Sequence, residues 1–217
     1  MNRTVLYTYW RSSASYRVRI ALNLKDLEYG SRAVNLVRGG GEQKKAEYLE
    51  LNPQGLVPLL IIDGLAISQS LAIIEYLEER WPEPPLLPSE PAARARVRSL
   101  ALAIACDIHP LNNSGVHRYL GQEMGIGEEG RLSWYRHWID VGFGAIETRL
   151  SRDSETGRFC HGDLPGLADI FLVPQVYNAQ RFDCDMSRFP QIMRINEACL
   201  ELEAFHRAAP ESQPDAE

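Results

Sequence analysis

Cysteine is scarce in this chain, with only four in 217 residues, and no two of them form a C-x-x-C pair. They are Cys106, Cys160, Cys184 and Cys199. A chain of this length does not need disulfides to hold its fold, so we expect reduced thiols. Disulfide reductase chemistry of the thioredoxin type is excluded, because residues 12–15 hold no cysteine where a redox pair would be needed.

The chain also has fewer basic than acidic residues, and it has no long apolar run. Lys and Arg total 23 against 29 Asp and Glu, and the net charge of −6 argues against a general binder of nucleic acids or membrane surfaces. No apolar stretch approaches the length of a bilayer span, and the first residues show no signal-peptide pattern. There is no internal repeat. Because 45% of residues are apolar, a substantial core can form. The absence of a signal pattern, together with the unpaired cysteines, leads us to expect a cytoplasmic protein.

The spacing of apolar residues predicts an α/β domain over residues 1–81, in the order βαβαββα. Strands alternating with helices imply a sheet with parallel pairs that helices cover. Asp63-Gly64 is typical of a hairpin turn between the last two strands. The predicted strands are 5–10, 29–36, 59–62 and 65–67, and the predicted helices are 17–25, 43–51 and 70–80.

Residues 82–91 are predicted to be a linker, because their prolines exclude both a helix and a central strand. From there to residue 217 the apolar residues recur at helical spacing, which predicts an all-α bundle over 92–217 with a frayed end after Ala209. Cys106 lies on one of these apolar stripes, so we expect a buried, inert thiol. The stripes cover residues 97–120, 132–150, 167–182 and 192–205.

Ser12 and Ser13 stand where the first strand hands over to the first helix. A serine there caps the helix by accepting from the backbone N–H groups of its first turn. The same N–H groups, with the positive end of the helix dipole, also stabilise an anion such as a thiolate. The alternative is that both serines only cap the helix.

Val57-Pro58 places a proline at the entrance of a buried strand, where proline is tolerated. A cis bond here would turn the backbone of Val57 outward toward an extended peptide, although an ordinary trans proline is the commoner case. Gln69-Ser70 opens the next helix, whose N-terminus suits a carboxylate as well as a simple cap.

Three arginines lie at or near the start of the first helix. Arg11 precedes it, and Arg17 and Arg19 lie within it. Guanidinium groups at a pocket mouth suit dicarboxylates. Arginines on a solvated helix face are the alternative.

Together these segments resemble the zeta class of the glutathione transferase superfamily, which includes maleylacetoacetate and maleylpyruvate isomerases. Residues 11–22 resemble the class signature S-S-C-x-x-R-V-R-I-A-L, and residues 52–58 resemble its N-P-x-x-x-V-P segment with a cis proline. Residues 69–78 match Q-S-x-A-I-I-E-Y-L-E, and residues 106–113 and 173–176 are also typical. The resemblance covers nearly the whole chain.

The resemblance implies a thioredoxin-like domain, a helical domain, a homodimer and glutathione as coenzyme, with no metal. It makes Ser13 the first candidate for stabilising the thiolate and Ser12 the second. It also implies Arg11, Arg17 and Arg181 as ligands for substrate carboxylates. The residues implied at glutathione are Ser12, Ser13, Gln43, Val57, Pro58, Gln69, Ser70, His109 and Asn113.

Two positions depart from the class pattern. Ala14 replaces the signature cysteine, so no mechanism can use a protein thiol in this motif. Gly166 replaces the capping threonine before a buried helix, although Asp169 is present, and glycine offers no side-chain acceptor. We therefore expect a weaker cap there.

The activity implied is cis–trans isomerisation of an unsaturated dicarboxylate, from maleylacetoacetate to fumarylacetoacetate in tyrosine and phenylalanine catabolism. A thiolate adds to the alkene, the bond rotates, and elimination returns the thiol. The alternatives are the same reaction on maleylpyruvate, a broad glutathione transferase or dehalogenase, and a binding module without catalysis.

Overall fold

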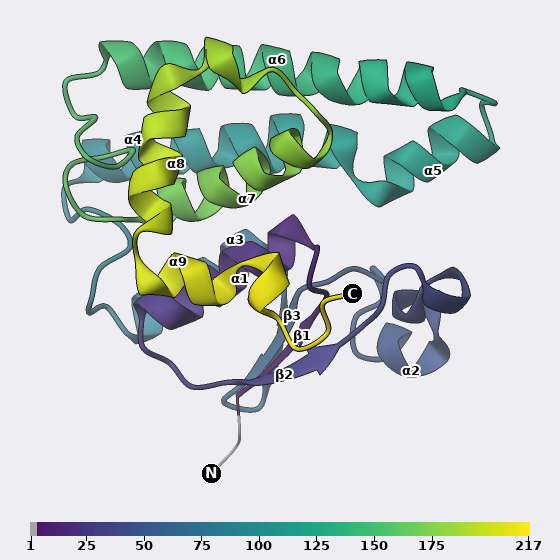
Figure 1. The fold of residues 1–217 in the computed structure, drawn as a ribbon. Coiled ribbons are helices and arrows are strands. Elements are labelled where there is room, and N and C mark those ends of the chain that lie inside the picture. Colours follow the sequence, from purple (N-terminus) through teal and green to yellow (C-terminus); the bar gives the residue numbers. More distant parts are fainter. Residues whose placement is uncertain (1–3) are drawn as a thin grey trace. The chain divides into compact units, whose positions relative to one another are not determined.

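The computed structural model describes residues 4–217 (Figure 1). Its contacts divide the chain into two units. The first unit runs up to Leu86 and also includes Glu201–Glu217, and the second unit is Leu87–Leu200. No helix among residues 4–217 is both long and apolar enough to span a bilayer.

The first unit is built on a four-stranded sheet in the order β2-β1-β3-β4. β1 (Val5–Thr8) pairs in parallel with β2 (Gly30–Ala33) and antiparallel with β3 (Leu59–Ile62), and β3 pairs antiparallel with β4 (Leu65–Ser68). Leu6 and Leu60 stand opposite each other on the two central strands, and both are fully buried. The predicted thioredoxin-like βαβαββα arrangement is confirmed.

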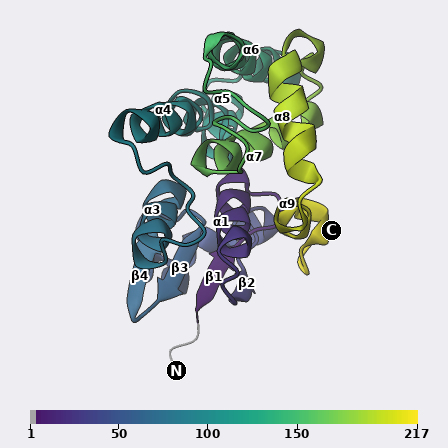
Figure 2. The same ribbon diagram turned by 90° about the vertical axis from the view of Figure 1, so that its left-hand side faces the viewer.

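Helices cover the sheet of the first unit. α1 (Ser13–Leu24) and α3 (Ser70–Arg80) pack against each other on one face (Figure 2), and α9 (Glu203–Ala208) packs beside α1. α2 (Ala46–Leu49) is a single turn that follows the 3-10 turns η1 (Arg38–Gly40) and η2 (Glu42–Lys44). The helix predicted over residues 43–51 is thus mostly replaced by shorter turns.

A buried ion pair closes the first unit at the ends of α1 and α3. Lys25 Nζ lies 2.6 Å from the Glu78 carboxylate and also donates to the carbonyls of Trp81 and Pro84. Glu78 in turn accepts from the backbone N–H of Leu86. The proline-rich segment after α3 is therefore fastened to the first unit by one ammonium group and one carboxylate.

The second unit is a bundle of α4 (Pro91–Leu102), α5 (Ser114–Gln122), α6 (Glu128–Arg152), α7 (Leu167–Arg181) and α8 (Pro190–Leu200). α7 contacts both α4 and α8, and most of its residues are buried. Pro91 occupies the first turn of α4, and Glu90 caps that helix by accepting from Ala93 N–H. The predicted all-helical architecture is confirmed.

The buried helix α7 begins without a side-chain cap, because its N-cap residue is Gly166. Asp169 supplies the reciprocal half of the capping arrangement. Its carboxylate accepts from Gly166 N–H at 2.9 Å and from Cys160 N–H at 2.8 Å. Burial raises the pKa of Asp169, while these backbone bonds oppose the rise.

The end of the chain corrects our domain boundary. We expected residues 92–217 to form the helical domain and the segment after Ala209 to fray. Instead Glu201–Glu217 groups with the first unit, where Tyr16 Oη donates to the carbonyl of Phe205 and Arg19 Nε donates to that of Ala208. These partners lie almost two hundred residues away in sequence, so no local pattern reveals them.

Candidate functional site

Ser12 is the N-cap of α1 in the first unit. Its backbone is extended, and its Oγ accepts from the N–H of Ser15 at 3.2 Å. A hydroxyl whose oxygen accepts still has its proton to donate, and the Ser12 side chain is only partly buried. Ser13, the first residue of the helix, is 5% exposed. The geometry therefore presents Ser12 to a ligand more openly than Ser13.

Aromatic residues hold Arg11, immediately before the cap. Its guanidinium lies 4.5 Å from the centre of the Trp10 ring, and Nη2 reaches the Tyr9 hydroxyl at 3.5 Å. Within the described chain, its Nε has no hydrogen-bond partner. Among the described residues, Arg11 thus keeps an unused donor beside Ser12.

The turn before β3 is held by two donors on one carbonyl. Tyr48 Oη donates to the Leu56 oxygen at 2.6 Å, and Asn52 Nδ2 donates to the same oxygen at 2.8 Å. Burial raises the pKa of Tyr48 to about 12, so its hydroxyl stays protonated at neutral pH. The next peptide bond, Val57-Pro58, is cis, as the resemblance implied. The backbone at Val57 is therefore fixed from the preceding residue.

Gln43 lies in η2 with its side chain turned inward. It is 8% exposed, and its Oε1 is buried without a hydrogen-bond partner among residues 4–217. The side chain packs so closely on Gly41, which has φ +105°, that a Cβ there would approach it to 2.5 Å. A buried amide with an unused oxygen suits a ligand that brings a donor.

The N-terminus of α3 is the second helix start that the sequence analysis singled out. Its N-cap, Gln69, has φ +70° and gives no side-chain cap, so the first-turn N–H groups are not satisfied by that residue. Ser70 follows, 7% exposed, and accepts from Arg17 Nη1 at 3.4 Å. A helix N-terminus backed by a buried guanidinium favours a carboxylate.

Two of the three arginines do not lie at a pocket mouth. Arg17 is 2% exposed and reaches Ser70, so it faces the interior of the first unit. Arg19 is fully buried and donates to backbone carbonyls and to Thr8 Oγ1, at 3.0 Å. Position on the helix could not separate these roles, because each depends on what packs over the residue.

His109 and Asn113 lie in the second unit, around a π-helical turn, η3 (Ala103–Ile108). The His109 N–H bonds to the Ile104 carbonyl at 2.9 Å across that turn. Asn113 caps α5, with its Oδ1 accepting from Val116 N–H at 2.9 Å and its Nδ2 donating to Pro110. These two bonds are local to the second unit, and Asn113 stays a predicted glutathione contact.

Arg181 ends α7 at the head of an aromatic stack. Its guanidinium is 4.7 Å from the centre of Phe182, which stacks on Tyr135 at 4.0 Å. His117 also contacts both rings, and burial lowers the pKa of that imidazole. Sequence reasoning missed His117, because a histidine in an amphipathic helix carries no signal of its own.

The cysteines differ from expectation at one position. Cys106 is exposed rather than buried, because it lies opposite the helix face that buries Ile104 and Ile108. Cys160 and Cys199 are buried, and burial raises the pKa of each thiol. Burial likewise raises the pKa of Cys184, to about 11.

The first unit thus carries a hydroxyl donor at a helix N-terminus, a fixed backbone turn and a second helix N-terminus. This set fits a short peptide with a thiol and a carboxylate. Residues 11–80 match the family profile described as "Glutathione S-transferase, N-terminal domain". The chain belongs to the glutathione transferase family.

Relatives of this glutathione transferase span its whole length. A probable maleylacetoacetate isomerase of Vibrio cholerae is 54% identical over 216 residues, covering 100% of both chains. The holo structure of a bacterial zeta-class maleylpyruvate isomerase is 47% identical, with a TM-score of 0.96 over 98% of this chain and 100% of that one. A maleylacetoacetate isomerase from Methylobacterium extorquens, with bound malonate and glutathione, is 44% identical, with a TM-score of 0.94 over 98% and 99%. The zeta-class resemblance is confirmed.

Proposed function

We propose that this chain is a glutathione-dependent isomerase that converts maleylacetoacetate to fumarylacetoacetate in tyrosine and phenylalanine catabolism. The observation that carries the proposal is the serine-capped N-terminus of α1. It offers a hydroxyl donor in a motif where this chain has Ala14 in place of the class cysteine. Full-length identity to a probable maleylacetoacetate isomerase supports the same activity.

The residues of the first unit fit glutathione. The N-terminus of α3, with Ser70 backed by Arg17, suits the γ-glutamyl carboxylate. The fixed turn at Val57 suits the cysteinyl backbone, and the unused Oε1 of Gln43 suits a donor farther along the peptide. Gln69 and Pro58 complete this surface by setting the backbone at the two turns.

When bound, glutathione supplies the sulfur nucleophile that makes rotation about the substrate double bond possible. The protein has to keep that sulfur ionised. Ser12 does so by donating a hydrogen bond from its hydroxyl to the sulfur while keeping its own proton, and the dipole of α1 adds a favourable field. We therefore place Ser12 before Ser13 as the donor, the reverse of our sequence-based order, because Ser13 is buried.

A substrate with two carboxylates also needs cations. Arg11 is the best placed in the first unit, next to Ser12 and with an unused Nε. Arg17 serves the γ-glutamyl end instead, through Ser70. Arg181 of the second unit stays a predicted ligand for a substrate carboxylate, and His109 and Asn113 stay predicted glutathione contacts.

Maleylpyruvate is the second candidate substrate, because a maleylpyruvate isomerase matches this chain at 47% identity with a TM-score of 0.96. Conjugation of glutathione to electrophiles would use the same sulfur. We further propose that the protein is a cytoplasmic homodimer.

The test is to incubate the protein with glutathione and each cis substrate, and to follow the alkene protons by NMR. We expect the trans product from maleylacetoacetate at a higher kcat/KM than from maleylpyruvate. A faster reaction with maleylpyruvate would transfer the assignment to that substrate. Accumulation of a stable conjugate without trans product would show a transferase instead.

A further inference from the structure

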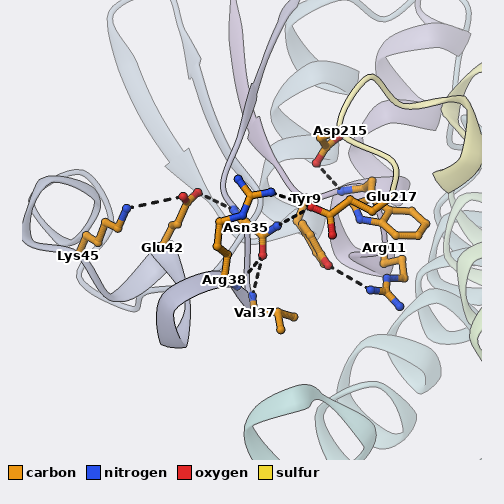
Figure 3. A network of polar contacts seen from close by, with 10 residues as sticks. Tyr9, Arg11, Asn35, Val37, Arg38, Glu42, Lys45, Asp215 and Glu217 are labelled. Atoms are coloured by element: carbon orange, nitrogen blue, oxygen red, sulfur yellow. Dashed lines mark hydrogen bonds and ion pairs between the residues drawn. The ribbon is translucent and has the colours of Figure 1, made fainter.

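Residues 213–217 lie against two loops of the first unit that carry proposed glutathione residues. Gln213 anchors the segment, since it is 8% exposed and its Nε2 donates to the carbonyls of Arg207 and Ala209, each at 2.9 Å. Figure 3 shows Asp215 and Glu217 pointing toward the residues of these two loops.

Asp215 holds the loop that leads into α1. Its Oδ2 accepts from the backbone N–H of Trp10 at 3.0 Å. Arg19 holds the carbonyl groups of the same loop. Its buried guanidinium donates to the Trp10 oxygen at 3.0 Å and to the Tyr9 oxygen at 3.4 Å. The Ser12 N–H bonds to that same Tyr9 oxygen at 2.9 Å. The position of the Ser12 cap thus depends on a peptide held by Arg19 on one side and Asp215 on the other.

Glu217 reaches the second loop, the one before Gln43. Its Oε1 accepts from Arg38 Nη2 at 2.9 Å and from Asn35 Nδ2 at 3.3 Å (Figure 3). The Asn35 N–H donates to Glu42, the neighbour of Gln43. Arg38 and Glu217 are largely exposed, so this contact is weaker than that of Asp215.

We infer that Asp215 is a positioning residue for the glutathione site, which it serves by fixing the Trp10 peptide and through it the Ser12 hydroxyl. This inference rests on the proposed function of Ser12. A charge-assisted bond to a backbone N–H is among the stronger hydrogen bonds in a protein. Losing it would let the loop shift, and a hydroxyl aimed at a thiolate is sensitive to small displacements.

The test compares Asp215→Ala with Asp215→Asn, which keeps an oxygen acceptor for the Trp10 N–H. Glu28→Ala is the matched control, because it removes an exposed carboxylate beyond the far end of α1. The readouts are kcat/KM for glutathione, the pKa of the bound thiol from its ultraviolet absorbance, and hydrogen exchange of the Trp10 amide.

We expect Asp215→Ala to lower kcat/KM for glutathione roughly five- to twentyfold and to raise the pKa of the bound thiol, since one charge-assisted bond is lost. Asp215→Asn should restore most of both, and Glu28→Ala should change neither. Glu217→Ala should have less than about a twofold effect, as its contact is exposed.

The outcomes separate two failures. If the wild-type protein shows no glutathione-dependent activity, the proposed function fails and the inference fails with it. If the wild type is active and Asp215→Ala matches Glu28→Ala in kcat/KM and thiol pKa, the inference alone is overturned, even where Trp10 exchange accelerates. If Asp215→Ala unfolds, Asp215→Asn provides the test. Fast exchange of the Trp10 amide in that variant, with a thiol pKa equal to that of the wild type, would also contradict the inference.

Discussion

Ser12 has two roles in this account, and substitutions of this one residue separate them. As the cap of α1 it accepts from Ser15 N–H at 3.2 Å, and losing such a cap to alanine costs about 1 kcal/mol of stability. As a donor to a thiolate it makes a charge-assisted bond worth about 1.5–3 kcal/mol. At about 1.4 kcal/mol per decade, that loss lowers kcat by roughly one to two decades.

The three variants are Ser12→Ala, Ser12→Gly and Ser12→Thr. Alanine removes both roles. Glycine removes the hydroxyl but costs only about a few tenths of a kcal/mol as a cap. Threonine keeps the hydroxyl and the cap. We expect alanine and glycine to share the loss of kcat, alanine alone to lose clear stability in urea, and threonine to stay near wild type.

The reasoning about Ser12 is refuted if glycine at this position retains wild-type kcat, because the serine would then be only a cap. Ser13→Ala provides the comparison. We expect it to lower kcat less than Ser12→Ala does. A larger loss from Ser13→Ala would return the donor role to that residue.

The remaining predictions concern stability and thiol reactivity. Glu78→Gln leaves the buried ammonium of Lys25 uncompensated and should cost about 3–5 kcal/mol in urea unfolding, with much of it restored by adding Lys25→Met. Burial raises the pKa of Asp169 in the folded protein. The contribution of this carboxyl group to the free energy of unfolding is therefore complete below its pKa in the unfolded chain, and it is lost as pH rises through its pKa in the folded protein. Asp169→Asn should therefore flatten this part of the stability–pH curve. A chromogenic disulfide should label Cys106 quickly and Cys184 slowly, and Cys106→Ser should keep full isomerase activity.

Local signals were sufficient to predict most of the architecture. The turn residues Asp63 and Gly64 marked the hairpin between β3 and β4. Ser12, as a cap, marked the start of α1 at Ser13, which the apolar spacing alone had put at residue 17. Helical periodicity located α6 and α7 to within a few residues at their ends. These features depend on neighbours in sequence, which is why pattern and capping rules find them.

Features that depend on distant partners were missed. β1 was predicted through Trp10 but ends at Thr8, because the next peptides bond to Arg19 and Asp215 instead of a strand. The π-helical turn before His109 was also missed, since one extra residue in a turn leaves the apolar pattern nearly unchanged.

The most direct test of the central claim is whether glutathione acts as a recycled coenzyme. The same preparation is assayed on maleylacetoacetate with glutathione, with S-methylglutathione and with neither, while free thiol is counted. The account predicts many turnovers per glutathione with no loss of thiol, and no catalysis by the S-methyl form. Isomerisation without a free thiol, or consumption of one thiol per product, would contradict it.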